Sequence, residues 1–527
     1  EISCSLVGSE MCIRDSSFTG CFGRKKSGEA FSMPIMDEPT SLDPQIADSN
    51  SEKLVAANCY EGLVRIMADG TIGKGVATDW NISDDGLTYT FKLRNNSHWA
   101  MFSGHKAVLG ENYEDTFDIT VKAEDFKFGI ERTLSEQTGS ADAPLFSAVK
   151  SISTPDDFTI VFNLSYADDN FLYALTNPGA MPCDEEFFNL TNGKYGLDAK
   201  YLLCNGPFHV SKWTEKTSVK LAKNNEYNGE SSVSPSSVTF YINNDDSEVA
   251  DKMNSVTYDV AFLSSSQFSS IENKKDLNSV AVQNVTYSFI FNQNDNNYRN
   301  KNMRLAFCRS CDTSSLFDSQ SDISKADGIV PPSCKIGGED YRNGNAAELL
   351  SYDETLAKKN FNDALLELGS SSVETTILCT EQYESFVKQM VQKLQKTLGV
   401  KFVSTVKVVS ESDLEAAVND GNYSVAFYPF KAKSSFAGEI IEGFDQNNIF
   451  GYESDVLSQK IRNIKNNSGS LEGERSAVAD AENYLVSEAV IMPVFYENSY
   501  FVTSKKTSGI YFYSSADNVC FINAKKS

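Results

Sequence analysis

Residues 38–63 read EPTSLDPQIADSNSEKLVAANCYEGL, and this stretch tells more about the fold than any other part of the chain. It opens with two prolines that punctuate a turn. Apolar side chains then recur at helical spacing, which predicts an amphipathic helix: Leu54, Ala57, Tyr60 and Leu63. Apolar and polar residues alternate over 87–93, as they do in a half-buried strand. The first part of the chain therefore predicts a turn, a helix and a strand.

The length and charge of the chain limit what it can be. With 527 residues it is too long for one hydrophobic core, so two or three domains, or two large lobes, are expected. The sequence has no run of eighteen apolar residues, so no membrane-spanning helix is predicted. The formal net charge of −25 argues against nucleic acid as a partner, because phosphate binding needs a basic surface.

The second half of the chain alternates strands and helices. The predicted order is strand, helix, strand, helix, strand, over 374–379, 382–398, 400–409, 412–419 and 423–428. Gly399 ends the first helix, and Ser412 is the candidate N-cap of the second. This order favours parallel strand pairing with right-handed crossovers. It is the pattern of one lobe of a two-lobed α/β binding protein.

Short motifs follow one another along nearly the whole chain. They are the turn and helix of 38–63, a helix over 121–132, a strand over 158–164, the turn 205–208 (NGPF), 223–227 (KNNEY), the strand 287–294, the helical segment 303–307 and 491–496 (IMPVFY). In this order they resemble the extracytoplasmic solute-binding proteins of peptide ABC importers, family 5, which include the oligopeptide- and dipeptide-binding lipoproteins. The resemblance covers nearly all of residues 31–524.

The resemblance implies an α/β fold of the two-lobed, periplasmic-binding-protein type II-like kind. It implies an extra subdomain in the first lobe, a hinge, and a ligand cleft between the lobes. Residues 1–30 are expected to hold a leader remnant, a lipobox and a tether. The expected first lobe has a core made of 31–68, 206–288 and 499–527 and an extra subdomain over 69–205. Residues 289–498 are expected to form the second lobe.

The N-terminal residues predict a lipid anchor. Residues 18–21 (FTGC) resemble a bacterial lipobox, and the polar stretch 22–29 follows as a tether would. Residues 1–17 carry charged side chains where an apolar signal segment belongs, so the true leader is expected to be missing or replaced. Beside the family resemblance, lipidation of Cys21 is the expectation, and an unmodified cysteine is the alternative.

Motifs for catalysis, metal binding or cofactor binding are weak. The three histidines lack ligand spacing with carboxylates or cysteines. Eleven cysteines form no even disulfide framework, and the pair in 308–311 (CRSC) is predicted to be buried or incidental thiols. Paired carboxylates at 156–157, 168–169 and 245–246 are interpreted as turn residues. No catalytic residue, metal ligand or cofactor is therefore predicted.

The resemblance implies a receptor and not an enzyme. The chain would be a lipid-anchored monomer at the outer face of the cytoplasmic membrane. It would capture a peptide or peptide-like solute and present it to the transmembrane permease subunits of an ABC importer. Three alternatives stay open: a secreted hydrolase with a carboxylate pair in the interlobe cleft, a non-transport sensor lipoprotein, and the same fold with a non-peptide ligand such as an oligosaccharide or a metal chelate.

The resemblance also locates an anchor for the ligand. In peptide-binding relatives, an aspartate after a second-lobe strand pairs with the α-amino group of the peptide. Here Phe430 falls at the family's tryptophan and Lys433 at its aspartate. In this register the anchor charge is reversed, and two buried ammonium groups would repel each other. Either the loop has shifted, or the ligand presents a carboxylate or neutral group there, or the lysine points into solvent.

Further candidate ligand contacts lie in or beside the family motifs. Glu52 falls near a first-lobe position whose acidic side chain touches the ligand in relatives, and its alternative is an exposed helix carboxylate. The others are Tyr60, Glu61, Trp99, Asn205 and Tyr496. Tyrosine and tryptophan provide a large contact area with a polar tip, as a permissive peptide cleft needs. Each of these residues is equally compatible with a place in the core.

Overall fold

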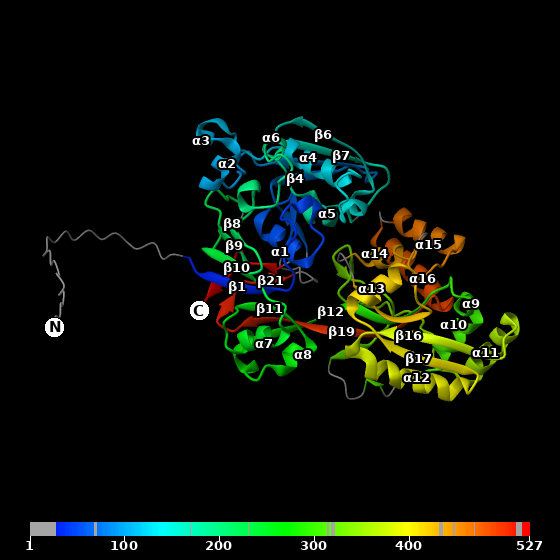
Figure 1. Cartoon of the computed structure of the whole chain (residues 1–527). Helices are drawn as coiled ribbons and strands as arrows, with labels where there is room; N and C mark the ends of the chain where they lie inside the picture. The colour runs from blue at the N-terminus through cyan, green and yellow to red at the C-terminus, as the bar shows by residue number, and fades with distance from the viewer. Residues whose placement is uncertain are drawn as a thin grey trace, which may run out of the picture.

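The computed structural model describes residues 28–67, 71–168, 170–229, 231–313, 316–317, 322–431, 436–445, 448–467, 470–512 and 519–527. Figure 1 shows two lobes, a first lobe drawn mostly in blue to green and a second lobe drawn mostly in yellow to orange. Two long strands, β12 (Leu277–Phe291) and β19 (Ile491–Ser504), run between the lobes. Within the described ranges, no helix combines the length and apolar character needed to cross a membrane.

The core of the first lobe contains a four-stranded sheet. Its strands lie in the order β1 (Ala30–Ile35), β10 (Ser237–Ile242), β9 (Ser218–Lys223) and β8 (Phe208–Thr214). β1 and β10 pair in parallel, and the other neighbours are antiparallel. The predicted helix is present as α1 (Asn50–Cys59), which buries Leu54 and Val55 beside β8. It ends before Tyr60 and Leu63, which the spacing had included, because the backbone of Tyr60 is extended. It begins at Ser49, whose side chain forms a reciprocal capping box with Glu52.

The rest of the first lobe carries a second, antiparallel sheet. Its order is β4 (Ala77–Ile82), β5 (Thr88–Leu93), β7 (Thr159–Leu164) and β6 (Val149–Asp156). The alternation predicted for 87–93 is confirmed, because Tyr89, Phe91 and Leu93 are buried. α4 (Ala123–Leu134) packs on β6 and β7. Shorter elements complete the lobe: β2 (Val64–Ile66), β3 (Ile72–Lys74), α2 (Lys106–Leu109), α3 (Tyr113–Thr116), α5 (Phe171–Ala174), α6 (Glu185–Leu190), α7 (Asp246–Asn254) and α8 (Ser265–Ser270).

A seven-stranded sheet links the two lobes. Its order is β11 (Val260–Ser264), β19, β12, β18 (Val425–Lys431), β16 (Val373–Cys379) and β17 (Phe402–Val408), and β13 (Ile323–Lys325) pairs with β19. The predicted parallel pairing is confirmed for β16 with β17 and for β16 with β18. α12 (Glu384–Leu398) and α13 (Glu411–Asn419) connect these strands, as predicted. The N-cap of α13 is Ser410 and not Ser412, because the side chain of Ser410 accepts from Asp413 N.

The remaining helices cover the second lobe around two apolar clusters. They are α9 (Asn296–Arg299), α10 (Lys301–Arg309), α11 (Glu354–Leu368), α14 (Ala437–Glu442), α15 (Asp455–Asn466) and α16 (Leu471–Ser487). Cys308 and Cys311 are buried at the end of α10, as predicted, and burial raises the pKa of both thiols to about 12. A small hairpin, β14 (Lys335–Ile336) and β15 (Glu339–Asp340), also belongs to this lobe.

The predicted lobe boundaries at 288/289 and 498/499 both fall inside the two long strands. One end of β19 pairs with β11 in the first lobe, and the far end of β12 pairs with β18 in the second. β12 has register shifts between Val282 and Val285 and between Tyr287 and Ser288. Bulges of this kind bend a strand. The place where the chain passes from one lobe to the other is therefore part of the sheet itself. The exact division into domains stays a prediction.

Candidate ligand-binding site

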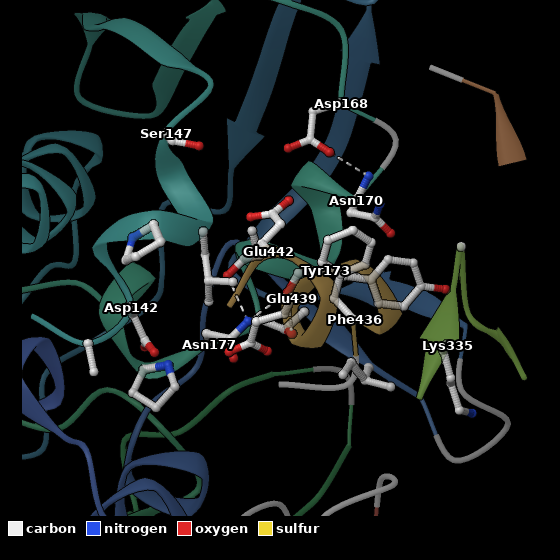
Figure 2. A pocket seen from close by; sticks show the side chains of 18 of the residues that line it. Asp142, Ser147, Asp168, Asn170, Tyr173, Asn177, Lys335, Phe436, Glu439 and Glu442 are labelled. Carbon is white, nitrogen blue, oxygen red and sulfur yellow. Dashed lines mark hydrogen bonds between the residues drawn. The ribbon is translucent and has the colours of Figure 1, made fainter. Parts of the chain in front are cut away.

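A cavity of about 410 Å³ lies between the two lobes. Its first-lobe wall comes from α1, Ile66, the segment 141–147, the loop after β7, α5 and the residues up to Met181. Its second-lobe wall comes from the β14–β15 hairpin, α14, the end of α15 and the start of α16. Figure 2 shows Asp168, Asn170 and Tyr173 on the first-lobe side, with Glu439 and Glu442 close by. Any solute in this cavity therefore contacts both lobes.

The cavity wall combines aromatic and charged side chains. Tyr166, Tyr173 and Phe436 contribute rings. The charged residues are five acids and three lysines: Asp142, Asp168, Glu439, Glu442, Glu474, Lys53, Lys335 and Lys465. Ion pairs join members of this set, among them Lys53 with Asp142 and Lys465 with Glu442, each at 3.8 Å. Apolar surface with a few polar groups is typical of a small-molecule site.

The carboxylates influence one another across the cleft. Burial raises the pKa of Glu442, and the negative charges of Glu439, Asp168 and Asp445 raise it further, while Lys465 lowers it. Asp168 belongs to the first lobe and Glu442 to the second, so this repulsion acts between the lobes. It opposes the arrangement seen here whenever Glu442 is ionised.

A hydrogen bond also joins the two lobes at the cavity. Asn170 Nδ2 donates to Glu474 Oε1 at 2.7 Å. Asn170 is oriented by its own backbone, because its N–H donates to Asp168 Oδ1 at 2.9 Å, as Figure 2 shows. Glu474 lies in the first turn of α16, where the helix dipole favours a carboxylate. This contact ties the loop after β7 to the second lobe.

The predicted contact Glu52 lies outside the cavity wall. Its Oε1 accepts from Thr40 N and Thr40 Oγ1, both at 2.8 Å, and from Ser41 N at 3.3 Å. Its Oε2 accepts from Asp48 N at 3.0 Å and from Ser49 N at 3.2 Å. Burial raises the pKa of Glu52, but these hydrogen bonds outweigh burial and lower it overall. The carboxylate thus holds the turn in front of α1.

Four other predicted residues are buried inside the first lobe. Asn205 Oδ1 accepts from Glu61 N at 3.0 Å, and Asn205 Nδ2 donates to Glu61 O at 2.8 Å. The Glu61 carboxylate pairs with Arg94 and accepts from the Tyr227 hydroxyl at 2.9 Å. The Tyr60 and Tyr195 hydroxyls are 3.3 Å apart. Trp99 is fully buried, and its backbone N–H donates to Ile119 O at 2.8 Å. These residues join separate segments of the first lobe.

The two predicted second-lobe residues that the structure describes also lie outside the cavity wall. Phe430 stacks with Phe444 and with Phe450, each with ring centroids 5.8 Å apart. The Tyr496 hydroxyl accepts from Asp327 N at 3.1 Å. Lys433 and Cys21 lie outside the described residues. Phe436, which the structure describes, lines the cavity.

Sequence reasoning missed the residues that form the cavity. Asp168 was interpreted only as a turn residue, and Asn170, Tyr173, Glu439 and Glu442 were not selected at all. The available signal was a cluster of aromatic and polar residues, 166–173, directly after the predicted strand 158–164. Within the described ranges, no group of three or more His, Cys, Asp or Glu side chains is placed to hold a metal ion.

Comparisons with known proteins agree with this architecture. Residues 71–450 match the sequence model of the bacterial extracellular solute-binding proteins, family 5. The dipeptide-binding protein DppE of Bacillus subtilis is 24% identical over 497 residues, which cover 90% of this chain and 88% of DppE.

Solved structures give the same result for the fold. Listeria monocytogenes OppA bound to peptide matches with a TM-score of 0.74 at 21% identity, over 95% of this chain and 100% of OppA. A dipeptide-binding protein from Pseudoalteromonas, in complex with Met-Leu, matches with a TM-score of 0.75 at 17% identity, over 95% of this chain and 100% of that one. The predicted two-lobed fold is confirmed, and the chain belongs to family 5 of the bacterial extracellular solute-binding proteins.

Proposed function

We propose that this chain is the extracytoplasmic receptor of an ABC importer and that it binds peptides or peptide-like solutes in the cavity between its lobes. The observation that carries the proposal is the placement of that cavity, whose walls come from both lobes. A ligand that contacts both lobes stabilises the closed arrangement over the open one. The importer could then recognise the loaded receptor by its closed shape.

The chemistry of the cavity suits a short peptide. A peptide has two charged ends and a row of backbone donors and acceptors. The cavity provides carboxylates, lysines and the amides of Asn170 and Asn177, with aromatic rings for side chains. Its volume of about 410 Å³ is near the lower end of the roughly 300–1,000 Å³ typical of ligand pockets. A short peptide also agrees with the names of two similar proteins, the dipeptide-binding protein DppE and the dipeptide-binding protein in complex with Met-Leu.

The finer parts of the proposal follow from the family. The receptor acts as a monomer, carries a lipid on Cys21, and delivers its solute to the transmembrane permease subunits without covalent chemistry or a cofactor. The relatives are named for binding and not for hydrolysis, which favours a receptor over a secreted hydrolase. The eight candidate contacts named from the sequence, Lys433 with its reversed charge among them, remain part of the proposal, although the seven that the structure describes lie outside the wall of this cavity.

A thermal-shift assay tests the proposal. Dipeptide and tripeptide mixtures should raise the melting temperature, since a ligand at ~100 times its Kd adds about 2.7 kcal/mol to the free energy of unfolding. Mass spectrometry of solute released from the purified protein should detect short peptides. A shift with oligosaccharides, a metal chelate or an acidic metabolite, together with none from peptides, would overturn the peptide assignment and leave the fold intact.

A further inference from the structure

Residues 323–345, here called the strap, connect the hinge to the cavity. The strap begins with β13, which pairs with β19 at Ile323 to Lys325. It continues into the β14–β15 hairpin, and the tip of that hairpin lines the cavity with Lys335, Gly337 and Gly338. One end of the strap thus lies on a strand that crosses between the lobes, and its middle faces the ligand site.

The hinge strands hold the strap by side-chain contacts. Gln283 lies in the irregular part of β12, and its Nε2 donates to Ser324 Oγ at 2.8 Å. Its backbone carbonyl accepts from Ser333 N at 3.0 Å. On β19, the Tyr496 hydroxyl accepts from Asp327 N at 3.1 Å and donates to Val330 O at 3.4 Å. The position of the strap therefore depends on both crossing strands.

Glu482 of α16 joins the two arms of the strap. Its side chain is 1% exposed. Oε1 accepts from Ile329 N at 2.7 Å and from Val330 N at 2.9 Å, on the arm before the hairpin. Oε2 accepts from the Tyr341 hydroxyl at 3.0 Å, on the arm after it. One buried carboxylate therefore fixes the hairpin from both sides.

Arg342 completes the junction. It pairs with both carboxylate oxygens of Glu482, with Nη1 2.9 Å from Oε2, and its Nε donates to Val330 O at 2.7 Å. A Cβ at residue 328 would collide with Arg342 and press on Glu482, so the junction requires Gly328. A buried, bidentate pair with its remaining donors and acceptors satisfied is geometrically specific. Removing one partner leaves the other buried and uncompensated.

We propose that Glu482, together with Arg342 and Tyr496, is a positioning residue that sets ligand affinity by holding the strap hairpin against the cavity, although none of the three lines it. The inference rests on the proposed function, because it assigns a role in binding at the same cavity. Because the base of the strap is attached to β12 and β19, a hinge movement of these two strands also moves the β14–β15 hairpin. A binding site needs interactions of this kind behind it, because they hold the residues that touch the ligand in place.

The test compares three variants with the full-length protein. Glu482→Gln keeps an acceptor oxygen but removes the charge opposite Arg342, and Tyr496→Phe removes a single hydroxyl. Arg304→Gln is the matched control. Arg304 is a buried cation that donates to Glu488 O and Ala489 O, just beyond the other end of α16, and it does not touch the strap. Binding of a dipeptide mixture is measured by calorimetry, with the melting temperature and amide hydrogen exchange over 329–342 as parallel readouts.

The expected result is a separation of binding from stability. Glu482→Gln should weaken binding about tenfold and Tyr496→Phe about threefold, within the roughly 2- to 30-fold range of such indirect effects. Both should speed exchange over 329–342. Arg304→Gln should lower the melting temperature as much as Glu482→Gln and leave the Kd within about twofold.

Two outcomes overturn the inference. One is an unchanged Kd in Glu482→Gln, whether or not exchange over 329–342 rises. The other is an equal loss of affinity in Arg304→Gln. A wild-type protein that binds no peptide overturns the proposed function instead, and unchanged exchange over 329–342 in Glu482→Gln then rejects the positioning role as well.

Discussion

At the scale of single residues, burial alone does not identify a ligand contact. Glu52 was predicted near the ligand from its place in the chain, yet its two carboxylate oxygens accept five hydrogen bonds from residues 40–49. The pattern Ser49-x-x-Glu52 is that of a capping box, which was a local signal for this role. Tyr173 carries no such local motif, and the cavity that it lines is completed by residues of the other lobe, such as Glu439 and Glu442.

The stabilising role of Glu52 can be tested directly. Glu52→Ala should lower the free energy of unfolding by about 2–3 kcal/mol, because several buried N–H groups lose their acceptor. Urea denaturation measures this loss, and Glu111→Ala, at an exposed carboxylate, serves as control. Because the pKa of Glu52 is lowered in the folded state, its contribution is present above its ordinary value of 4.5. It is lost as the pH falls through the lowered pKa, so the variant should be less sensitive to acid than the wild type.

Tyr173 provides the corresponding test of the cavity. Tyr173→Ala should weaken binding of the best dipeptide by at least about 1 kcal/mol, or roughly fivefold, because an aromatic ring is lost from the wall. Tyr241→Ala, at a tyrosine that is 39% exposed on β10, is the control and should bind as the wild type does. Equal affinity of all three proteins in calorimetry would place the ligand elsewhere.

At the scale of secondary-structure elements, periodicity predicts the strands and helices, while their ends depend on cap geometry. The order of β16, α12, β17, α13 and β18 is as predicted, because each element carries its own apolar pattern. α13 nevertheless begins after Ser410, since two serines at 410 and 412 both suit an N-cap. The β14–β15 hairpin was not predicted, since two-residue strands are too short to show alternation.

The hairpin turn yields a prediction at this scale. Gly337 and Gly338 have φ of 57° and 82°, as a two-residue turn with both φ positive requires. Gly338→Val should cost about 1–3 kcal/mol of backbone strain and displace the hairpin tip, weakening binding about tenfold. Gly369→Val, at a φ of 64° beyond the end of α11, carries similar strain away from the cavity. Binding that falls equally in both variants would show that strain, and not hairpin position, is responsible.

At the scale of the whole molecule, the sequence predicted two lobes and a cleft but not the composition of the cleft. The lobes follow from ordered local motifs, whereas the cavity exists only where residues of 53–66 and 141–181 in one lobe meet residues of 335–474 in the other. Residues so far apart in sequence show no joint pattern in a single chain. The same meeting of lobes brings Asp168 toward Glu442, and their repulsion makes the closed arrangement sensitive to pH.

The direction of that pH dependence follows from the raised pKa of Glu442. Burial and the charges of Glu439, Asp168 and Asp445 raise it in the arrangement seen here, although Lys465 partly offsets them. Separation of the lobes relieves part of the burial and removes the charge of Asp168, while Glu439, Asp445 and Lys465 stay on the same lobe as Glu442. The pKa then falls toward its ordinary value of 4.5, so the closed form holds the proton more tightly. Ionised Glu442 therefore opposes closure at neutral pH, and this opposition disappears as the pH falls through the raised pKa.

We therefore expect the ligand-free protein to become more compact as the pH is lowered from neutrality through the raised pKa of Glu442, with the radius of gyration followed by small-angle X-ray scattering. Glu442→Gln should be compact throughout and lose this dependence, because it removes the ionising group. Glu415→Gln, at an exposed carboxylate on α13, should behave as the wild type. The same pH response in Glu442→Gln as in the wild type would show that another group controls closure. A cationic group on a bound ligand would relieve the same repulsion, so saturating peptide should also reduce the effect of pH on the wild type.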